Sequence, residues 1–293
     1  MWRLLLVLTV GVSSLAAACP TCSCANPALT AMGAEQPFEG RLRFASTFRA
    51  WSQTDGTAEV DLAQVRELRL DLTASWTPLK RFTVLLNVPL QARERTDVSL
   101  AKERGFGPGE IDLSTRFLLV GAEGMRPRHL LNLVVNARLP TAPTLRDASG
   151  KAFEVDAQLG AGAFVPAAGL SWSAFLGDQW STFVSLVGDV PLEGRYGLRL
   201  GPGVQLIGAA QFQPWSWLGL RAGLDARSEA MSFVRGVASP ALSGLLLQAL
   251  ADVVVSPVSR LMLTAGARVP FLDTRPGPVS ATPVFLLSVV VDV

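Results

Sequence analysis

Apolar and polar residues alternate over most of the chain, and the clearest instance is residues 244–271. Every second residue over 245–255 is small or apolar, whereas the positions between them carry Gln248 and Asp252. A short turn-forming segment with a proline leads into a second alternating run, residues 261–271. A period of two places the apolar residues on one face of a β-strand and the polar residues on the other. Two such runs joined by a short turn predict an antiparallel hairpin.

The length of these runs matches the thickness of a membrane. Each run holds about ten residues, as does a tilted strand that crosses the hydrocarbon core of a bilayer. Similar runs recur along the chain, and their number is even, as in single-chain bacterial barrels. We therefore predict an all-β fold, a transmembrane antiparallel up-and-down β-barrel of about 12 strands. The predicted crossings are residues 41–51, 65–76, 82–93, 109–120, 128–140, 154–176, 180–191, 197–212, 217–227, 245–255, 261–271 and 283–293.

The predicted strands are joined alternately by short turns and long loops. The short turns are residues 77–81, 177–179, 214–216 and 256–260, and the long loops are residues 52–63, 94–108, 141–153 and 228–243. Short turns belong on the periplasmic side of such barrels and long loops on the outside. Tryptophans beside the short turns fit the aromatic girdle of a membrane interface. They are Trp76, Trp180, Trp215 and Trp217.

The polar phase of the strands should line the interior of the barrel. Its charges have both signs, and a zone of polar side chains inside a barrel can select among solutes. The predicted lumen and selectivity residues are Arg69, Asp71, Asn87, Arg93, Asp112, Arg116, Arg138, Asp156, Arg199, Arg221, Asp225, Asp252 and Arg268.

The N-terminus has the features of a secretory signal. Arg3 precedes an apolar core at residues 4–12, and three alanines at residues 16–18 form a small-residue cleavage site. We predict a signal peptide at 1–18, an irregular leader at 19–40 and the barrel at 41–293. A secretory signal followed by a barrel pattern predicts that the protein resides in the outer membrane of a Gram-negative-type bacterium, where it contacts outer-membrane lipid.

The three cysteines, Cys19, Cys22 and Cys24, all lie at the start of the leader. In an oxidising compartment they could form a Cys19–Cys22 disulfide with Cys24 left over. They could also provide a thiolate site for a soft metal such as Cu(I). Lipidation of Cys19 is a further alternative. The leader could dock a periplasmic partner or plug the lumen.

Composition excludes several other classes. The chain of 293 residues is 49% hydrophobic and 17% charged, yet beyond the N-terminus its longest uncharged stretches are broken by Gly and Pro. That argues against membrane helices. A net charge of +2 does not indicate a nucleic-acid partner. The only histidine, His129, lies beside a predicted periplasmic turn, so we expect no enzyme activity and no cofactor apart from a metal at the leader.

Four short motifs resemble those of a known group of barrels. They are residues 139–141 (Leu-Pro-Thr), 158–162 (Gln-Leu-Gly-Ala-Gly), 196–201 (Tyr-Gly-Leu-Arg-Leu-Gly) and 107–113 (Gly-Pro-Gly-Glu-Ile-Asp-Leu). The chain thereby resembles the bacterial outer-membrane "transporter" barrels related to the MetA-pathway phenol-degradation family. The resemblance implies a barrel that passes small molecules, often apolar or aromatic ones. Three positions depart from that group: Ala142 replaces a Gly, Glu110 an Asp, and the chain ends in Val293 rather than Phe or Trp.

Three functions are compatible with these patterns. The first is an outer-membrane channel with a charged lumen that passes small-molecule solutes. The second is a metal- or redox-handling protein that acts through its cysteine leader and uses the barrel as an anchor. The third is a structural barrel whose lumen charges pair with each other and fill the interior, as they do in small barrels.

Overall fold

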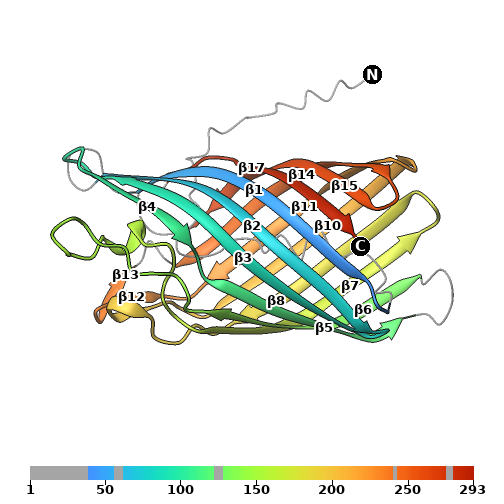
Figure 1. The fold of residues 1–293 in the computed structure, drawn as a ribbon, viewed down its shortest axis with the longest axis horizontal. Coiled ribbons are helices and arrows are strands. Elements are labelled where there is room, and N and C mark those ends of the chain that lie inside the picture. The colour runs from blue at the N-terminus through green and yellow to red at the C-terminus, as the bar shows by residue number, and fades with distance from the viewer. Residues whose placement is uncertain (1–38, 56–61, 122–127, 240–242, 275–279) are drawn as a thin grey trace, which may run out of the picture.

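The protein is a closed barrel of antiparallel strands (Figure 1). The computed structural model describes residues 39–55, 62–121, 128–239, 243–274 and 280–293. Twelve strands follow one another round the wall, and β1 pairs with both β2 and β17, which closes the ring. The wall strands are β1 (Leu42–Asp55), β2 (Ala63–Leu79), β3 (Phe82–Thr96), β5 (Ile111–Gly121), β6 (His129–Leu139), β7 (Val165–Leu176), β8 (Trp180–Asp189), β10 (Gly203–Trp215), β11 (Leu218–Glu229), β14 (Gly244–Val258), β15 (Leu261–Asp273) and β17 (Val284–Asp292).

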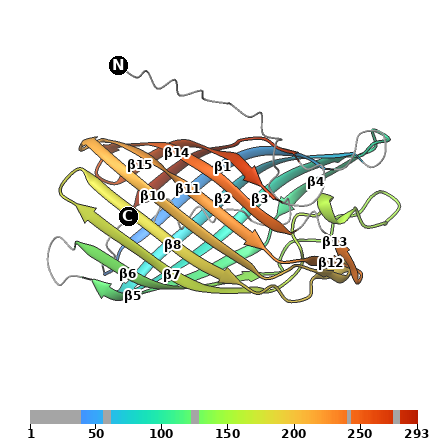
Figure 2. The same cartoon turned by 180° about the vertical axis from the view of Figure 1, so that it is seen from behind.

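The predicted fold is confirmed, since each of the twelve predicted crossings corresponds to one wall strand. Within the described residues, no helix is long and apolar enough to cross a membrane. The short turns gather at one end of the barrel and the long connections at the other, here called the outer end (Figures 1 and 2).

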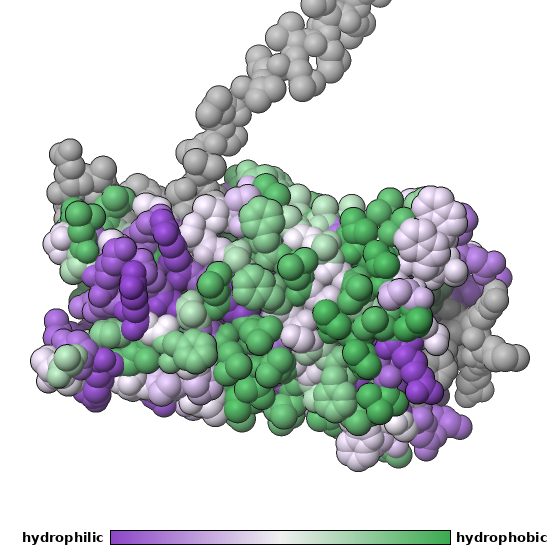
Figure 3. All heavy atoms as spheres, turned by 45° about the horizontal axis from the view of Figure 1, so that its top comes forward, coloured by the Kyte–Doolittle hydropathy of each residue, from purple (hydrophilic) through white to green (hydrophobic). Residues whose placement is uncertain are grey.

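Alternation along each strand separates an inner face from an outer face. On β2, Glu67, Arg69 and Asp71 are buried, whereas Leu68 and Leu72 between and beside them are exposed. Figure 3 shows that hydrophobic residues gather over the middle of the wall and hydrophilic residues toward its ends. Burying polar groups inside while exposing Leu and Phe outside is the arrangement required when the solvent of the outer face is lipid.

The short-turn end carries the expected aromatic girdle. Trp76, Trp180, Trp215 and Trp217 are all about half exposed there. The rings of Trp215 and Trp217 stack with their centroids 5.8 Å apart, on either side of the turn between β10 and β11. Their position agrees with a membrane interface, where amphipathic rings are favoured.

One region predicted as a loop is instead a hairpin. Strand β4 (Lys102–Pro108) pairs with the outer half of β3, from Leu90 to Thr96, so residues 94–108 extend the wall beyond the predicted crossing. The turn is closed by Asp97, whose Oδ1 accepts hydrogen bonds from the backbone N–H groups of Ser99 and Ala101 at 2.9 and 3.0 Å. The side-chain hydroxyl of Ser99 also donates to this carboxylate and lowers the pKa of Asp97.

Two predicted crossings begin later than expected. The crossing predicted at 154–176 starts at Val165, and the crossing predicted at 197–212 starts at Gly203. Glycines interrupt both regions, and Gly162 has a φ of +64°, which favours glycine because it has no Cβ. The residues before the two strands form short elements at the outer end: η1 (Val155–Ala157), η2 (Arg195–Gly197) and β9 (Leu198–Arg199). Strand β9 pairs with β12 (Ser232–Val234), which forms a hairpin with β13 (Val237–Ser239) within the predicted loop 228–243. A further short strand, β16 (Ser280–Ala281), pairs with the end of β1.

Candidate functional site in the barrel lumen

One side of the lumen is occupied by a buried ion-paired network centred on Asp71. The side chain of Asp71 is fully buried, and its two oxygens lie 2.5 Å from Arg49 Nη2 and 2.8 Å from Arg69 Nη2. Asn87 donates to the same carboxylate at 3.1 Å, and Thr73 donates to Asn87 at 3.0 Å. Strands β1, β2 and β3 bring these residues together because the register pairs Arg49 with Arg69 and Thr73 with Asn87. A carboxylate with this many donors is held in one orientation.

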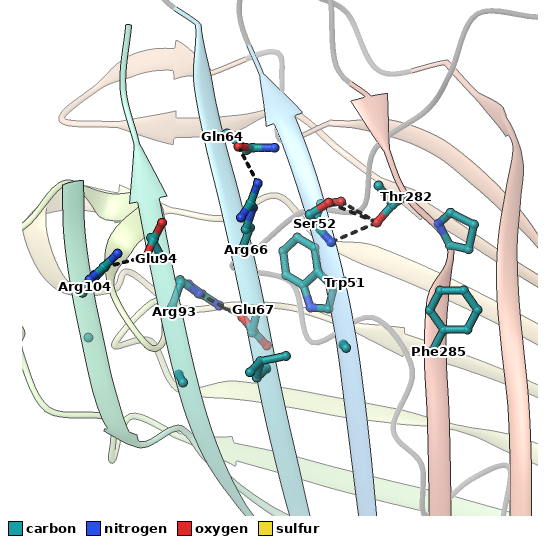
Figure 4. A pocket seen from close by; sticks show the side chains of 15 residues that line it. Trp51, Ser52, Gln64, Arg66, Glu67, Arg93, Glu94, Arg104, Thr282 and Phe285 are labelled. Atoms are coloured by element: carbon teal, nitrogen blue, oxygen red, sulfur yellow. Dashed lines mark hydrogen bonds and ion pairs between the residues drawn. The ribbon is translucent and has the colours of Figure 1, made fainter. Parts of the chain in front are cut away.

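A second buried ion pair lies nearer the outer end. Arg93 on β3 donates from Nε to Glu67 on β2 at 2.9 Å, and Figure 4 shows the two side chains side by side. The guanidinium of Arg93 also donates to the backbone carbonyl of Gln158. Gln158 does not belong to the wall, so Arg93 connects the wall to the segment that folds over its opening.

That segment, residues 141–164, is here called the mouth segment. Its fold is held by the amide of Gln158, which accepts from the backbone N–H of Leu145 at 2.9 Å and donates to the carbonyl of Phe153 at 2.9 Å. Leu159 and Gln158 are buried. The Gln91 amide lies between Leu159 and Arg69. With its nitrogen toward Leu159 it donates to that carbonyl at 2.8 Å and accepts from Arg69 at 3.0 Å.

Two further residues, Glu110 and Arg195, hold the mouth segment in place. Glu110, at the junction of β4 and β5, accepts a hydrogen bond from the backbone N–H of Gly162 at 2.5 Å. Arg195 in η2 donates to the carbonyls of Ala142 and Pro140. A Cβ at position 160 would lie 2.6 Å from the Glu110 side chain, so this close approach requires Gly160.

An apolar cluster lies on the opposite side of the lumen. Phe183 on β8, Ile207 on β10 and Leu250 on β14 are buried and pack into one cluster, with Ala209 beside it. Strand β8 stands six positions round the twelve-strand wall from β1, and β10 stands six positions from β2, so this apolar cluster lies across the barrel from the charged network. The lumen therefore has a charged wall around Asp71 and an apolar wall that is limited to the surroundings of this cluster.

Further ion pairs lie on other strands of the lumen and beside the apolar cluster. Arg268 on β15 contacts Asp225 on β11 at 2.8 Å, and Gln205 donates to the other oxygen of Asp225 at 2.9 Å. Arg221 pairs with Asp252 at 2.7 Å. Arg138 pairs with Asp112 at 3.1 Å. Charges of opposite sign compensate each other at every one of these positions, which lowers the cost of burying them.

Most of the predicted lumen residues lie on the inner phase of wall strands. Those that do are Arg69, Asp71, Asn87, Arg93, Asp112, Arg116, Arg138, Arg221, Asp225, Asp252 and Arg268. Two do not: Asp156 lies in η1 of the mouth segment, and Arg199 lies in β9, where its side chain is exposed. Both lie off the wall because the strands within the predicted crossings 154–176 and 197–212 begin only at Val165 and Gly203. A role for any of these residues in selectivity stays a prediction.

Several residues of the site are absent from the predicted set, among them Arg49, Glu67 and Gln158. Glu67 shares the inner phase of β2 with Arg69 and Asp71, so the period of two could have identified it. Gln158 could not be identified in this way, since its role depends on how the mouth segment folds back. His129 stacks on Trp172, with ring centroids 5.8 Å apart.

The cysteine site cannot be placed in the same way. Cys19, Cys22 and Cys24 lie outside the described residues. Among the residues that the structure does describe, no group of three or more His, Cys, Asp and Glu side chains could hold a metal ion.

Comparison with known proteins identifies the fold. At the level of sequence, the chain matches no family model and no curated protein. Its structure is similar to that of the COG4313 outer membrane channel from Pseudomonas putida F1, with a TM-score of 0.69, 12% identity, and coverage of 89% of this chain and 98% of that one. It is also similar to the beta domain of the Bordetella autotransporter BrkA, with a TM-score of 0.53, 11% identity, and coverage of 87% and 100%.

A third similar structure is the translocator domain of the autotransporter NalP from Neisseria meningitidis, with a TM-score of 0.51, 9% identity, and coverage of 89% and 91%. These similarities show the fold: the chain is a β-barrel of the kind found in Gram-negative outer membranes. They agree with the resemblance to outer-membrane transporter barrels. A fold shared by a channel and by autotransporter domains does not define a function, which has to be argued from the lumen.

Proposed function

We propose that the protein is an outer-membrane channel that passes small molecules, with apolar or aromatic solutes that carry a polar group as the preferred class. The observation that carries the proposal is the two-sided lumen. Its charged wall around Asp71 faces an apolar wall around Phe183, Ile207 and Leu250. A solute with an apolar body and a polar edge could contact both walls at once. The similarity to a channel barrel supports the proposal at the level of fold.

In this proposal the mouth segment is the gate. The contact between Arg93 and Gln158, together with the contact between Glu110 and Gly162, holds the segment against the outer end of the lumen. A solute that enters from outside has to pass this segment, so breaking its contacts should widen the opening. Channels select among solutes with rings of polar or charged groups, and they gate at constrictions.

The test is conductance in planar bilayers, together with liposome swelling in a panel of solutes. Gln158→Ala removes the hydrogen bonds that shape the mouth segment, and we expect a several-fold higher conductance and faster uptake of small aromatic acids. Gln179→Ala, in an exposed short turn at the opposite end, is the matched control and should behave as the wild type. Folded protein without conductance or solute uptake, in both the wild type and Gln158→Ala, would refute the channel.

A structural barrel is the second candidate, because the lumen charges are extensively paired with each other. The same conductance experiment decides between the two. A metal or redox role of Cys19, Cys22 and Cys24, or a periplasmic partner bound there, stays a separate prediction that the channel does not require.

A further inference from the structure

The register of four strands places a row of charges on the outer face of the wall. Directly opposite pairs run from Ser52 on β1 to Arg66 on β2, from Arg66 to Glu94 on β3, and from Glu94 to Arg104 on β4. All four side chains belong to the phase that faces away from the lumen. Directly opposite side chains lie about 5 Å apart. Arg66, Glu94 and Arg104 therefore form one continuous polar strip (Figure 4).

The row beneath this strip is apolar and hollow. It runs from Phe285 on β17 through Ala50, Leu68 and Ala92 to Phe106 on β4. The two alanines flank Leu68 and have small side chains, which leaves a groove of about 670 Å³ beneath the strip. Phe285 lines one end of this groove and Arg104 the other.

The strip lies where the membrane should end. Ten positions separate Trp76 in the girdle from Arg66 on the same strand. At about 3.3 Å per residue and a tilt of about 40°, they span roughly 25 Å along the barrel axis. The apolar band of outer-membrane barrels is about 25 Å tall. Arg66 and its neighbours therefore lie at the outer boundary of the apolar core, and the groove lies just inside it.

The charge of the strip is positive. Glu94 accepts from Arg104 at 2.5 Å and from Lys102 at 3.3 Å, so one carboxylate is shared by two cations. Arg66 contacts the side-chain oxygen of Gln64 at 3.4 Å, and the residues that the structure describes include no acidic partner for it. Three cations and one carboxylate leave an excess positive charge that can receive an anion. The side chain of Arg104 is 68% exposed, which leaves it accessible from the membrane side.

We propose that this groove binds the phosphorylated acyl-glycolipid of the outer leaflet, lipopolysaccharide, through its lipid A part. Arg66 and Arg104 would bind a lipid A phosphate, since guanidinium groups match phosphate oxygens in geometry and charge. One acyl chain would follow the apolar row over Ala50, Leu68 and Ala92. The occupant combines an anionic head with an apolar tail, as the groove combines a cationic strip with an apolar hollow. The site lies on the outside of the wall, so it does not depend on the proposed channel.

Native mass spectrometry of the full-length protein released from detergent counts bound lipids by mass and tests the site. The probes are bis-phosphorylated lipid A, the same lipid A without phosphates, and phosphatidylglycerol. We expect one lipid A to bind at least tenfold more tightly than either of the other two. Binding of phosphatidylglycerol as tight as that of lipid A would overturn the proposal.

Two variants with matched controls locate the site. The double variant Arg66→Gln, Arg104→Gln should weaken lipid A binding at least tenfold. Its control is the double variant Arg146→Gln, Lys151→Gln, which removes two charges of the mouth segment outside the groove and should leave lipid A binding unchanged. Ala92→Phe fills the hollow and should weaken lipid A with and without phosphates. Ala251→Phe, on the lipid-facing phase of β14, is its control.

Heat-modifiable mobility on gels confirms in each case that the barrel has folded. Wild-type affinity in both groove variants, or an equal loss in the controls, would refute the site.

Discussion

Replacing Asp71 with asparagine should destabilise the barrel strongly, because two buried arginines depend on this carboxylate. The Asp71 side chain is 0% exposed, and the side chains of Arg49 and Arg69 are each 8% exposed. Asparagine has nearly the same volume but no charge, so the substitution leaves both guanidinium groups buried without their counter-ion. Removing one partner of a buried pair costs about 3–5 kcal/mol. We expect a loss of about 3 kcal/mol in the free energy of unfolding, because Asn87 and water can compensate in part.

The measurement is urea unfolding of protein folded in lipid vesicles, followed by tryptophan fluorescence and extrapolated to zero denaturant. Asp252→Asn is the matched control. Its carboxylate also pairs with an arginine, Arg221, at 2.7 Å, but these two side chains keep 11% and 13% of their surface exposed. This pair joins one arginine rather than two and is slightly more exposed, so the expected loss is smaller than at Asp71, below about 3 kcal/mol.

A double-mutant cycle of Asp71→Asn and Arg49→Gln isolates the interaction between the two side chains. If water is excluded from the charged wall, the coupling energy should exceed about 1.5 kcal/mol. A coupling of less than about 0.5 kcal/mol, typical of exposed pairs, would show that water fills the lumen around Asp71. Solvent screening would then account for the weak coupling, and the strong dependence of Arg49 on Asp71 would be refuted.

Two other predictions concern the outer face and the leader. Leu72→Arg, midway along β2 with Leu72 43% exposed, should cost about 2–4 kcal/mol in vesicle unfolding, whereas Leu79→Arg, near the short-turn end with Leu79 60% exposed, should cost about 0–1 kcal/mol. Equal losses would contradict the position of the membrane. If the leader holds a soft metal, a peptide of residues 19–40 should bind Cu(I), and the same peptide with serine at positions 19, 22 and 24 should not.

The wall of the barrel could be predicted from the sequence because the alternation that defines each strand is a local property of the chain. Alternation on β14 and β15 is visible residue by residue, since lipid demands apolar side chains on one phase of every crossing. The same alternation assigns Asp71, Arg93 and Asp225 to the inner phase. It cannot say which arginine each carboxylate will meet, because that depends on the register between strands that are distant in the chain.

The outer end could not be predicted in this way. Beyond the membrane, no lipid requires an apolar face, so alternation stops being a guide. The hairpin of β3 and β4 carries charges on both phases and was therefore predicted as a loop. Residues 154–164 continue an apolar pattern into β7, yet they fold back over the opening. They are buried in part against the β9 region, where Ala161 and Ala163 pack against Leu198 and Leu200.

The outer-face groove depends on register alone. Ser52, Arg66, Glu94 and Arg104 come from four strands, and in the sequence they lie in or beside predicted loops among other polar residues. A shift of one residue between β2 and β3 would turn Glu94 toward the lumen and break the row, because neighbouring residues of a strand point to opposite faces. The Asp71 network in the lumen constrains that register, since Thr73 and Asn87 are paired directly across the same two strands. The buried network inside the barrel and the charged strip outside it are therefore held in place by one strand pairing. A destabilising change at Asp71 should for that reason weaken lipid A binding at Arg66, although the two residues lie on opposite faces of the wall.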